Sequence, residues 1–238
     1  MSGYKRFFVD CITEVTEITG EEFTHAVSVL RIKKGEKIFL LDNTGKEYVA
    51  EISSVEKKRI LATLIEESEN LCEPKEEILL IAGYLKGDKT ELVVQKAVEL
   101  GVKEIVVFSS AYSSAYMNDN KLERLNRVSL EACKQCGRAK VPKVTYAETL
   151  EEALKMGESY NNKLFACEFA TKTEVDFNAL NGSTAIVVGS EGGFSKEEFE
   201  VSKDLGYKTV YLGKRILRAE TACIALTAIV SNALKEFE

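Results

Sequence analysis

The stretch that most constrains this sequence is residues 185–226, in which two short apolar runs each end in a glycine loop and a helix follows. The run at 185–188 leads into Gly-Ser-Glu-Gly-Gly-Phe at 189–194, and the run at 209–212 leads into the basic loop 213–218. Short apolar strands that alternate with helices predict parallel β–α units. Ligands of such sheets bind beyond the carboxyl ends of the strands, so the two glycine loops predict the walls of one crevice.

The helix boundaries in this stretch carry their own signals. Ser195 followed by Glu198 is the pattern of a capping box, in which two side chains satisfy the first free backbone amides of a helix. Gly206 suits the left-handed position that ends a helix. A second, alanine-rich helix is expected from about Ala219.

The first glycine loop does not have the pattern of a phosphate-binding loop. It lacks both G-x-x-x-x-G-K-[ST] and G-x-G-x-x-G. It also carries Glu191 where a phosphate would require positive potential. The loop therefore predicts a neutral or cationic ligand, and the alternative is a tight turn with an exposed carboxylate.

The rest of the chain predicts two domains of an α/β protein. Residues 1–70 contain short strand candidates at 6–9, 37–41, 48–52 and 60–65, with a capping-box pattern at Thr19–Glu22 before a helix, and predict a small β-barrel. Residues 71–77, in the acidic stretch 66–77 that contains Pro74, are the expected linker. Residues 78–238 are expected to form the parallel-sheet domain, with strands at 78–83, 104–108, 144–146 and 162–167 and helices at 90–100, 121–137 and 150–156.

Composition limits the cellular setting. No apolar run approaches the roughly 20 residues that span a bilayer, and the first residues lack the pattern of a signal peptide, so we expect a cytoplasmic protein without a membrane partner. The net charge of −6 argues against non-specific nucleic-acid binding but permits a local basic surface. Cys133-x-x-Cys136 has no second cysteine pair and His25 is the only histidine, so no metal site is expected.

Several motifs together resemble a known family. They are Arg6-Phe7-Phe8, the segment HAVSVLR at 25–31, QKAVELGV at 95–102, the residues Glu131, Gln135, Arg138 and Pro142, the glycine loop 189–194 and LGKRILRAETA at 212–222. With these motifs the chain resembles the bacterial 16S ribosomal RNA (uracil-N3)-methyltransferases of the SPOUT class over nearly its whole length. The resemblance implies a PUA-like N-terminal β-barrel, a C-terminal α/β domain with a parallel sheet and a trefoil knot, and a homodimer with the active site at the subunit interface.

The resemblance also implies S-adenosylmethionine as methyl donor and 16S ribosomal RNA of the small ribosomal subunit as partner. The donor-binding residues that it implies lie in three loops: Cys167, Glu168, Gly189, Glu191, Gly192, Leu212, Gly213, Ile216, Leu217 and Arg218. The sequence departs from the family pattern in three places. Proline is usual where Ser190 stands and common where Lys214 stands, and the loop at Ala111 and Tyr112 lacks an acidic–basic pair, which puts its RNA contact in question.

The reaction suggests roles for charged residues. Uridine N3 must lose a proton, and a guanidinium could stabilise the resulting charge in the transition state. Arg218 is the first candidate for this catalytic role and Arg138, reaching the partner subunit's site, is the second, while Glu191 could orient groups or accept the proton. Arg6, Arg31 and Arg138 are expected to contact RNA. Two other readings stay open: a non-catalytic RNA-binding or assembly factor that retains the fold, and an adenine-nucleotide enzyme on an ordinary doubly wound sheet.

Overall fold

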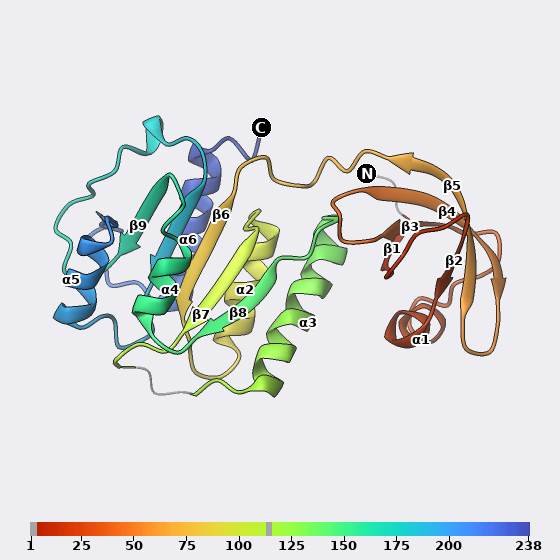
Figure 1. The fold of residues 1–238 in the computed structure, drawn as a ribbon, viewed down its shortest axis with the longest axis horizontal. Helices are drawn as coiled ribbons and strands as arrows, with labels where there is room; N and C mark the ends of the chain where they lie inside the picture. Colours follow the sequence, from red (N-terminus) through yellow and green to blue (C-terminus); the bar gives the residue numbers. More distant parts are fainter. Residues whose placement is uncertain (1–3, 113–115) are drawn as a thin grey trace. The chain divides into compact units, whose positions relative to one another are not determined.

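The computed structural model describes residues 4–112 and 116–238, and its contacts divide the chain into two compact units (Figure 1). Unit 1 runs to Glu73 and also contains Cys133–Val141. Unit 2 comprises Pro74–Ala132 and Pro142–Glu238. The expected division at residues 71–77 thus does not account for residues 133–141, which the sequence places in the parallel-sheet domain.

Unit 1 is a five-stranded sheet with one helix. Its elements are β1 (Lys5–Phe8), β2 (Val15–Ile18), α1 (Gly20–Ser28), β3 (Lys37–Leu41), β4 (Glu47–Val55) and β5 (Ile60–Ser68). The strand order is β1-β3-β4-β5-β2, with β1 parallel to β3 and the other pairs antiparallel. The alternating apolar residues of the strands meet Ala26 of α1 in a core that includes Phe7, Ile38, Leu40 and Ile52. Sequence reasoning missed β2, in which the buried positions are Thr16 and Ile18.

The start of α1 differs from its expected form. Thr19 occupies the N-cap position but its side chain makes no capping hydrogen bond. Glu22, which would complete a capping box, forms an ion pair with Lys134 instead. The box predicted at Thr19–Glu22 is therefore wrong, because another charge of unit 1 binds the carboxylate that it needs.

Hydrogen bonds explain why residues 133–141 belong to unit 1. The Glu73 carboxylate accepts from the backbone N–H groups of Ala139 (2.7 Å) and Lys140 (2.9 Å), and it pairs with the Arg138 guanidinium at 3.2 Å. The Asn43 side chain accepts from Val141 N–H at 2.7 Å. These partners lie far from residues 133–141 in the sequence, so no local pattern could have indicated the assignment.

Unit 2 is a six-stranded parallel sheet covered by helices. Its elements are β6 (Ile78–Gly83), α2 (Lys89–Glu99), β7 (Glu104–Phe108), most of α3 (Asp119–Cys136), β8 (Lys143–Ala147), α4 (Leu150–Met156), β9 (Asn162–Ala166), the 3₁₀-helix η1 (Phe177–Ala179), β10 (Thr184–Val188), α5 (Lys196–Asp204), β11 (Lys208–Val210) and α6 (Ala219–Ala233). The strand order is β11-β9-β10-β6-β7-β8, and all pairs are parallel. The parallel sheet expected from the alternating strands and helices is therefore confirmed.

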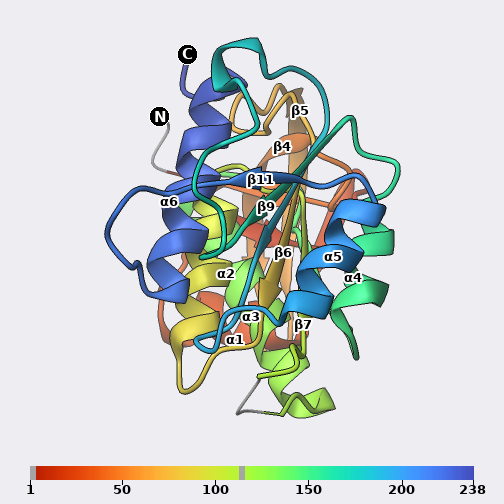
Figure 2. The ribbon, with the colours of Figure 1, turned by 90° about the vertical axis from the view of Figure 1, so that its left-hand side faces the viewer.

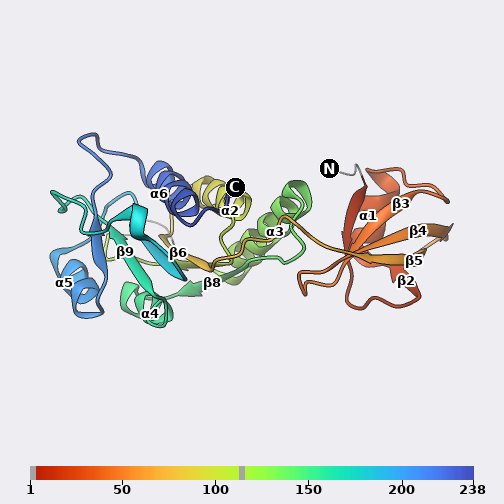
Figure 3. The same ribbon diagram turned by 90° about the horizontal axis from the view of Figure 1, so that it is seen from above.

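Helices α2 and α6 pack together on one face of this sheet and α4 and α5 on the other (Figures 2 and 3). Both faces of the central strands are consequently covered, and every residue of β6 and β10 is buried. This burial explains why these two strands are near-continuous apolar runs instead of alternating ones.

The path of the chain from β10 to α6 passes around β9 by way of the outermost strand β11. From β10 it passes through α5 to β11, on the far side of β9, and returns in α6, which packs on β10 and β6. The segment after β9 runs beside β11, where the Glu174 N–H donates to Thr209 O at 2.9 Å and the Glu174 carboxylate accepts from Thr209 N–H at 2.8 Å. The trefoil knot stays a prediction of the resemblance. In the part of the chain that the structure describes, no helix is long and apolar enough to cross a membrane.

Candidate functional site

The loops expected to form a crevice gather at the carboxyl edge of the unit 2 sheet. Val188 at the end of β10 is in register with Ala166 of β9 and Ala82 of β6, and Ala166 is in turn in register with Val210 of β11. Because these strands are parallel, the chain leaves all four at the same end of the sheet; Figure 2 labels β6, β9 and β11 of this set. This edge brings together the three segments that the sequence predicts as donor-binding loops.

The glycine loop after β10 packs against the end of β6 without side chains between them. A methyl group added at Gly83 would lie 2.4 Å from the backbone nitrogen of Ser190, which no real contact allows. Behind the loop, the Phe194 ring is 2% exposed and its centroid lies 4.2 Å from that of Phe165. The backbone of the glycine loop is therefore closely packed against the end of β6 and lies over the buried rings of Phe194 and Phe165.

Glu168, which follows β9, lies directly on the glycine loop. Its carboxylate accepts from Phe194 N–H at 3.4 Å. Gly193 has φ +67°, a backbone conformation that favours glycine, and a Cβ at this position would require the Glu168 carboxylate to move. Among the described residues Glu168 has no ion pair, and its negative charge stays at the surface of the loop.

Glu191 is engaged on the other side of the same loop. Its carboxylate accepts from Lys89 Nζ at 3.0 Å and from Lys86 N–H at 3.2 Å. Partial burial raises the pKa of Glu191, but the hydrogen bonds from Lys89 and the backbone outweigh it and hold the pKa below its ordinary value. A carboxylate with a lowered pKa is a weak base, which argues against Glu191 as the proton acceptor. Sequence reasoning identified 86–89 only as a loop and missed Lys89 as this partner.

The loop after β7 is tied to the glycine loop as well. Ser110 Oγ lies 2.8 Å from Ser190 Oγ in a buried hydrogen bond. The Ala111 N–H donates to Glu198 Oε1 at 2.9 Å, and Glu198 Oε2 accepts from Ser195 N–H in the capping box at the start of α5, which is confirmed. Ser190 thus gains a partner that proline could not provide. The sequence identified Glu198 only as a capping residue.

The basic loop after β11 is the exposed wall of the site. Ile216 is fully exposed, Leu212 and Leu217 are half-buried, and nothing lies within 4 Å of a Cβ added at Gly213. Arg218 is the N-cap residue of α6, and its exposed guanidinium has no ion pair among the described residues. A cation and several apolar side chains are therefore available at this wall to contact a ligand.

Cys167 contributes packing more than charge. It is 9% exposed, and burial raises the pKa of its thiol against the opposing effect of hydrogen bonds from the backbone of Phe169 and Ala170. The thiol is neutral at physiological pH. In the described ranges, no three His, Cys, Asp or Glu side chains are grouped so that they could hold a metal ion.

The other predicted site residues lie in unit 1. Arg138 is 3% exposed and bound to Glu73. Arg6 is also largely buried: its guanidinium pairs with Glu47 at 3.3 Å and lies 4.9 Å from the centre of the Phe39 ring. Both arginines therefore stabilise contacts within unit 1. Arg31 is exposed and has φ +51°.

The predicted site residues thus fall into two groups. Unit 1 contains Arg6, Arg31 and Arg138, and unit 2 contains Cys167, Glu168, Gly189, Glu191, Gly192, Leu212, Gly213, Ile216, Leu217 and Arg218.

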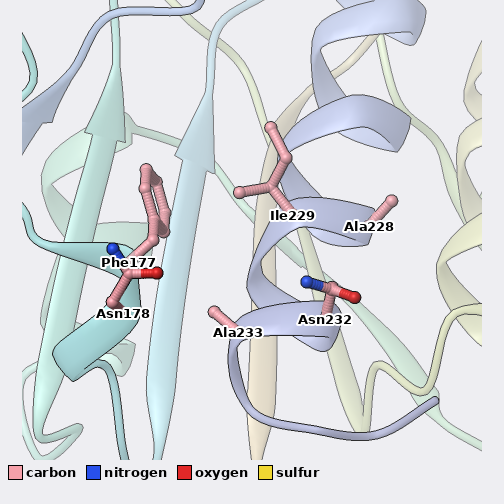
Figure 4. A pocket seen from close by; sticks show the side chains of 6 residues that line it. All are labelled: Phe177, Asn178, Ala228, Ile229, Asn232 and Ala233. Atoms are coloured by element: carbon pink, nitrogen blue, oxygen red, sulfur yellow. The ribbon is translucent and has the colours of Figure 1, made fainter.

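A shallow pocket lies apart from these loops, between η1 and the second half of α6 (Figure 4). Its volume is about 330 Å³, and it is lined by Phe177, Asn178, Ala228, Ile229, Asn232 and Ala233. None of these side chains titrates, and the pocket surface is apolar apart from the amides of Asn178 and Asn232.

Comparison with known proteins identifies the family. A family model described as "RNA methyltransferase domain" matches residues 72–231, and one described as "RNA methyltransferase PUA domain" matches residues 18–65. Ribosomal RNA small subunit methyltransferase E of Bacillus subtilis is 32% identical over 244 residues, which cover 94% of this chain and 95% of the relative. The chain belongs to the ribosomal RNA small subunit methyltransferase E family. The family expected from the sequence motifs is thereby confirmed.

Solved structures of methyltransferases share the fold. The enzyme of Neisseria gonorrhoeae bound to S-adenosyl methionine is 30% identical and superimposes with a TM-score of 0.86 over 97% of this chain and 98% of its own. A putative methyltransferase of Legionella pneumophila, in complex with the same cofactor, is 27% identical with a TM-score of 0.87, over 97% and 98% of the two chains. The fold class expected from the sequence, a small N-terminal β-domain followed by a SPOUT-type α/β domain, is confirmed.

Proposed function

We propose that this protein transfers the methyl group of S-adenosylmethionine to N3 of a specific uridine in 16S ribosomal RNA, in the cytoplasm. The observation that carries the proposal is the meeting of three loops, after β9, β10 and β11, at one edge of the sheet in a chain of this family. The small subunit is the partner, as the names of the relatives suggest.

The residues present suit the donor. Its sulfonium is cationic, and Glu168 is the carboxylate at the glycine loop without an ion pair among the described residues, because Glu191 is paired with Lys89. In the glycine loop Gly192 is exposed, and Leu212, Ile216 and Leu217 offer apolar surface for an adenine ring. The donor supplies an electrophilic methyl group, and the protein supplies position and a dry environment.

The uracil that accepts the methyl group requires a positively charged side chain, in contrast to the carboxylate near the donor. As the N3 proton leaves, negative charge spreads over N3 and the flanking carbonyl oxygens of uracil, and an aimed guanidinium stabilises it. Arg218 is our candidate because it stands exposed at the start of α6 and no carboxylate among the described residues neutralises it. Arg138 is a weaker candidate, since removing it from Glu73 would leave a partly buried carboxylate unpaired.

We further propose a homodimer. The pocket on α6 exposes apolar side chains, including Ile229 at 40% exposure, that a second copy would cover (Figure 4). The loop from Lys214 to Arg218 is exposed in the single chain, and a site completed by a partner would shield it.

One experiment separates this function from its alternatives. The protein is incubated with small ribosomal subunits and a donor labelled in its methyl group, and donor binding is measured in parallel by calorimetry. We expect donor binding and label in the ribosomal RNA. Donor binding without label would favour a non-catalytic RNA-binding factor, and no donor binding would favour an adenine-nucleotide enzyme.

A further inference from the structure

The short loop Ser109–Tyr112 is held on the glycine loop at three successive residues. Ser110 bonds to Ser190, Ala111 to Glu198, and the Tyr112 backbone lies against Gly192. A Cβ added at Gly192 would lie 2.5 Å from Tyr112 Cβ and 3.1 Å from Tyr112 O. The position of Tyr112 is thus fixed by a buried hydrogen bond, by a charge-assisted one and by close packing on glycine.

The ring of this tyrosine is nevertheless in solvent. Tyr112 is 56% exposed, and among the described residues its side chain has no hydrogen bond and no aromatic partner. A tyrosine with an anchored backbone and an exposed ring can stack on a planar ligand at a low cost in conformational entropy, because it has few side-chain torsions to immobilise on binding.

Strand order shows which flank of the glycine loop the ring serves. The sheet runs β11-β9-β10-β6-β7, so the loops after β9 and β11 lie on one side of the β10 loop and the β7 loop lies on the other. Glu168 packs on Gly193 from the first side and Tyr112 on Gly192 from the second. If the donor occupies the flank of β9 and β11, the acceptor approaches from the flank of β7.

Charge at this flank suits a nucleic acid. Lys86 is exposed after β6. The ammonium of Lys121, which donates to Tyr116 O at 2.6 Å, lies 5.4 Å from the centre of the Tyr84 ring, which follows the same strand. Such cations can bind phosphates while an aromatic ring stacks on a base, which is how proteins hold unpaired nucleotides. Glu191 does not oppose them, because its charge is balanced by Lys89.

We propose that Tyr112 is a stacking platform for a nucleobase of the RNA substrate, placed across the glycine loop from the methyl donor. This inference rests on the proposed function. It assigns to the β7 loop a contact with the acceptor that needs no arginine.

The test compares substitutions that keep or remove the aromatic face. Equilibrium binding of small ribosomal subunits is measured for the wild type and for Y112F, Y112W, Y112L and Y112A. Loss of one base–aromatic stack predicts about 5- to 150-fold weaker binding for Y112L and Y112A, whereas Y112F and Y112W stay close to the wild type. The matched control is F237A, because Phe237 is as exposed (57%) but follows α6, next to Glu236, which binds the backbone that enters β6 at the opposite edge of the sheet.

Two results would overturn the proposal. Wild-type affinity of Y112L would show that the aromatic face is not used. Donor affinity that falls in step with RNA affinity would show that the ring contacts the donor, and Y112W checks this directly because the chain has no other tryptophan and the fluorescence of this variant should not respond to donor alone. Wild-type protein that binds RNA through Tyr112 but transfers no methyl group would refute the proposed function and leave the stacking site intact.

Discussion

Among single residues, Arg218 is the one on which the proposed methyl transfer depends most. We predict that Arg218→Ala lowers kcat by about 10²- to 10³-fold at saturating RNA and donor, because a preorganised donor to the developing charge is lost. Arg215→Ala, in the same exposed loop, is the control and should leave kcat within a few-fold. Single-turnover methylation measures both, and an unchanged rate for Arg218→Ala would remove its electrophilic role.

Arg31 carries the RNA-binding prediction for unit 1. Its φ of +51° would strain alanine, whereas asparagine tolerates this region, so the appropriate change is Arg31→Asn. We expect the slope of log affinity against log salt to fall by about 1 for Arg31→Asn and to stay unchanged for Arg31→Lys. Equal slopes for wild type and Arg31→Asn would place Arg31 outside the interface.

Residue roles were the least predictable part of the sequence. The glycines and Glu168 were found because loop position and family motif coincide, and the structure packs them together. Arg138 pairs with Glu73, Arg6 with Glu47 and Glu191 with Lys89, and these partners are 65, 41 and 102 positions apart in the sequence. No periodicity or spacing reports such contacts, so exposed and engaged charges look alike in the sequence.

At the scale of elements, two similar capping patterns have different outcomes. The box at Ser195 and Glu198 is formed, and the one at Thr19 and Glu22 is not. We predict that Ser195→Ala costs α5 about 1 kcal/mol, which is roughly five-fold faster exchange of the amides in its first turn, and that Thr19→Ala leaves exchange in α1 nearly unchanged. Hydrogen exchange with mass spectrometry tests the pair, and equal responses would contradict the difference.

Most strands and helices could be predicted from the sequence because their buried positions are occupied by apolar residues in a regular pattern. The strands of unit 2 are apolar runs that end in glycine or polar residues, and their predicted ranges agree with the structure to within about two residues. Strand β2 was missed because a threonine occupies a core position. The attachment of residues 133–141 to unit 1 was missed because Glu73 and Asn43, distant in sequence, provide the bonds.

For the whole molecule, the oligomeric state stays a prediction, and we expect a homodimer. Light scattering should give twice the 26.5 kDa of the chain. Ile229→Asp places a charge in the apolar pocket on α6 and should shift the protein to monomers, while Ile65→Asp, at a similarly exposed isoleucine of unit 1, should not. A wild-type monomer, or a dimer that survives Ile229→Asp, would reject this surface as the interface.

The position of the transferred methyl group can be measured by mass spectrometry of nucleosides from 16S ribosomal RNA, after incubation of small subunits with the wild-type protein and S-adenosylmethionine. We predict that N3-methyluridine forms and that this product falls with Arg218→Ala. Methylation at a carbon of the base, at a ribose hydroxyl or at another nucleoside would contradict it.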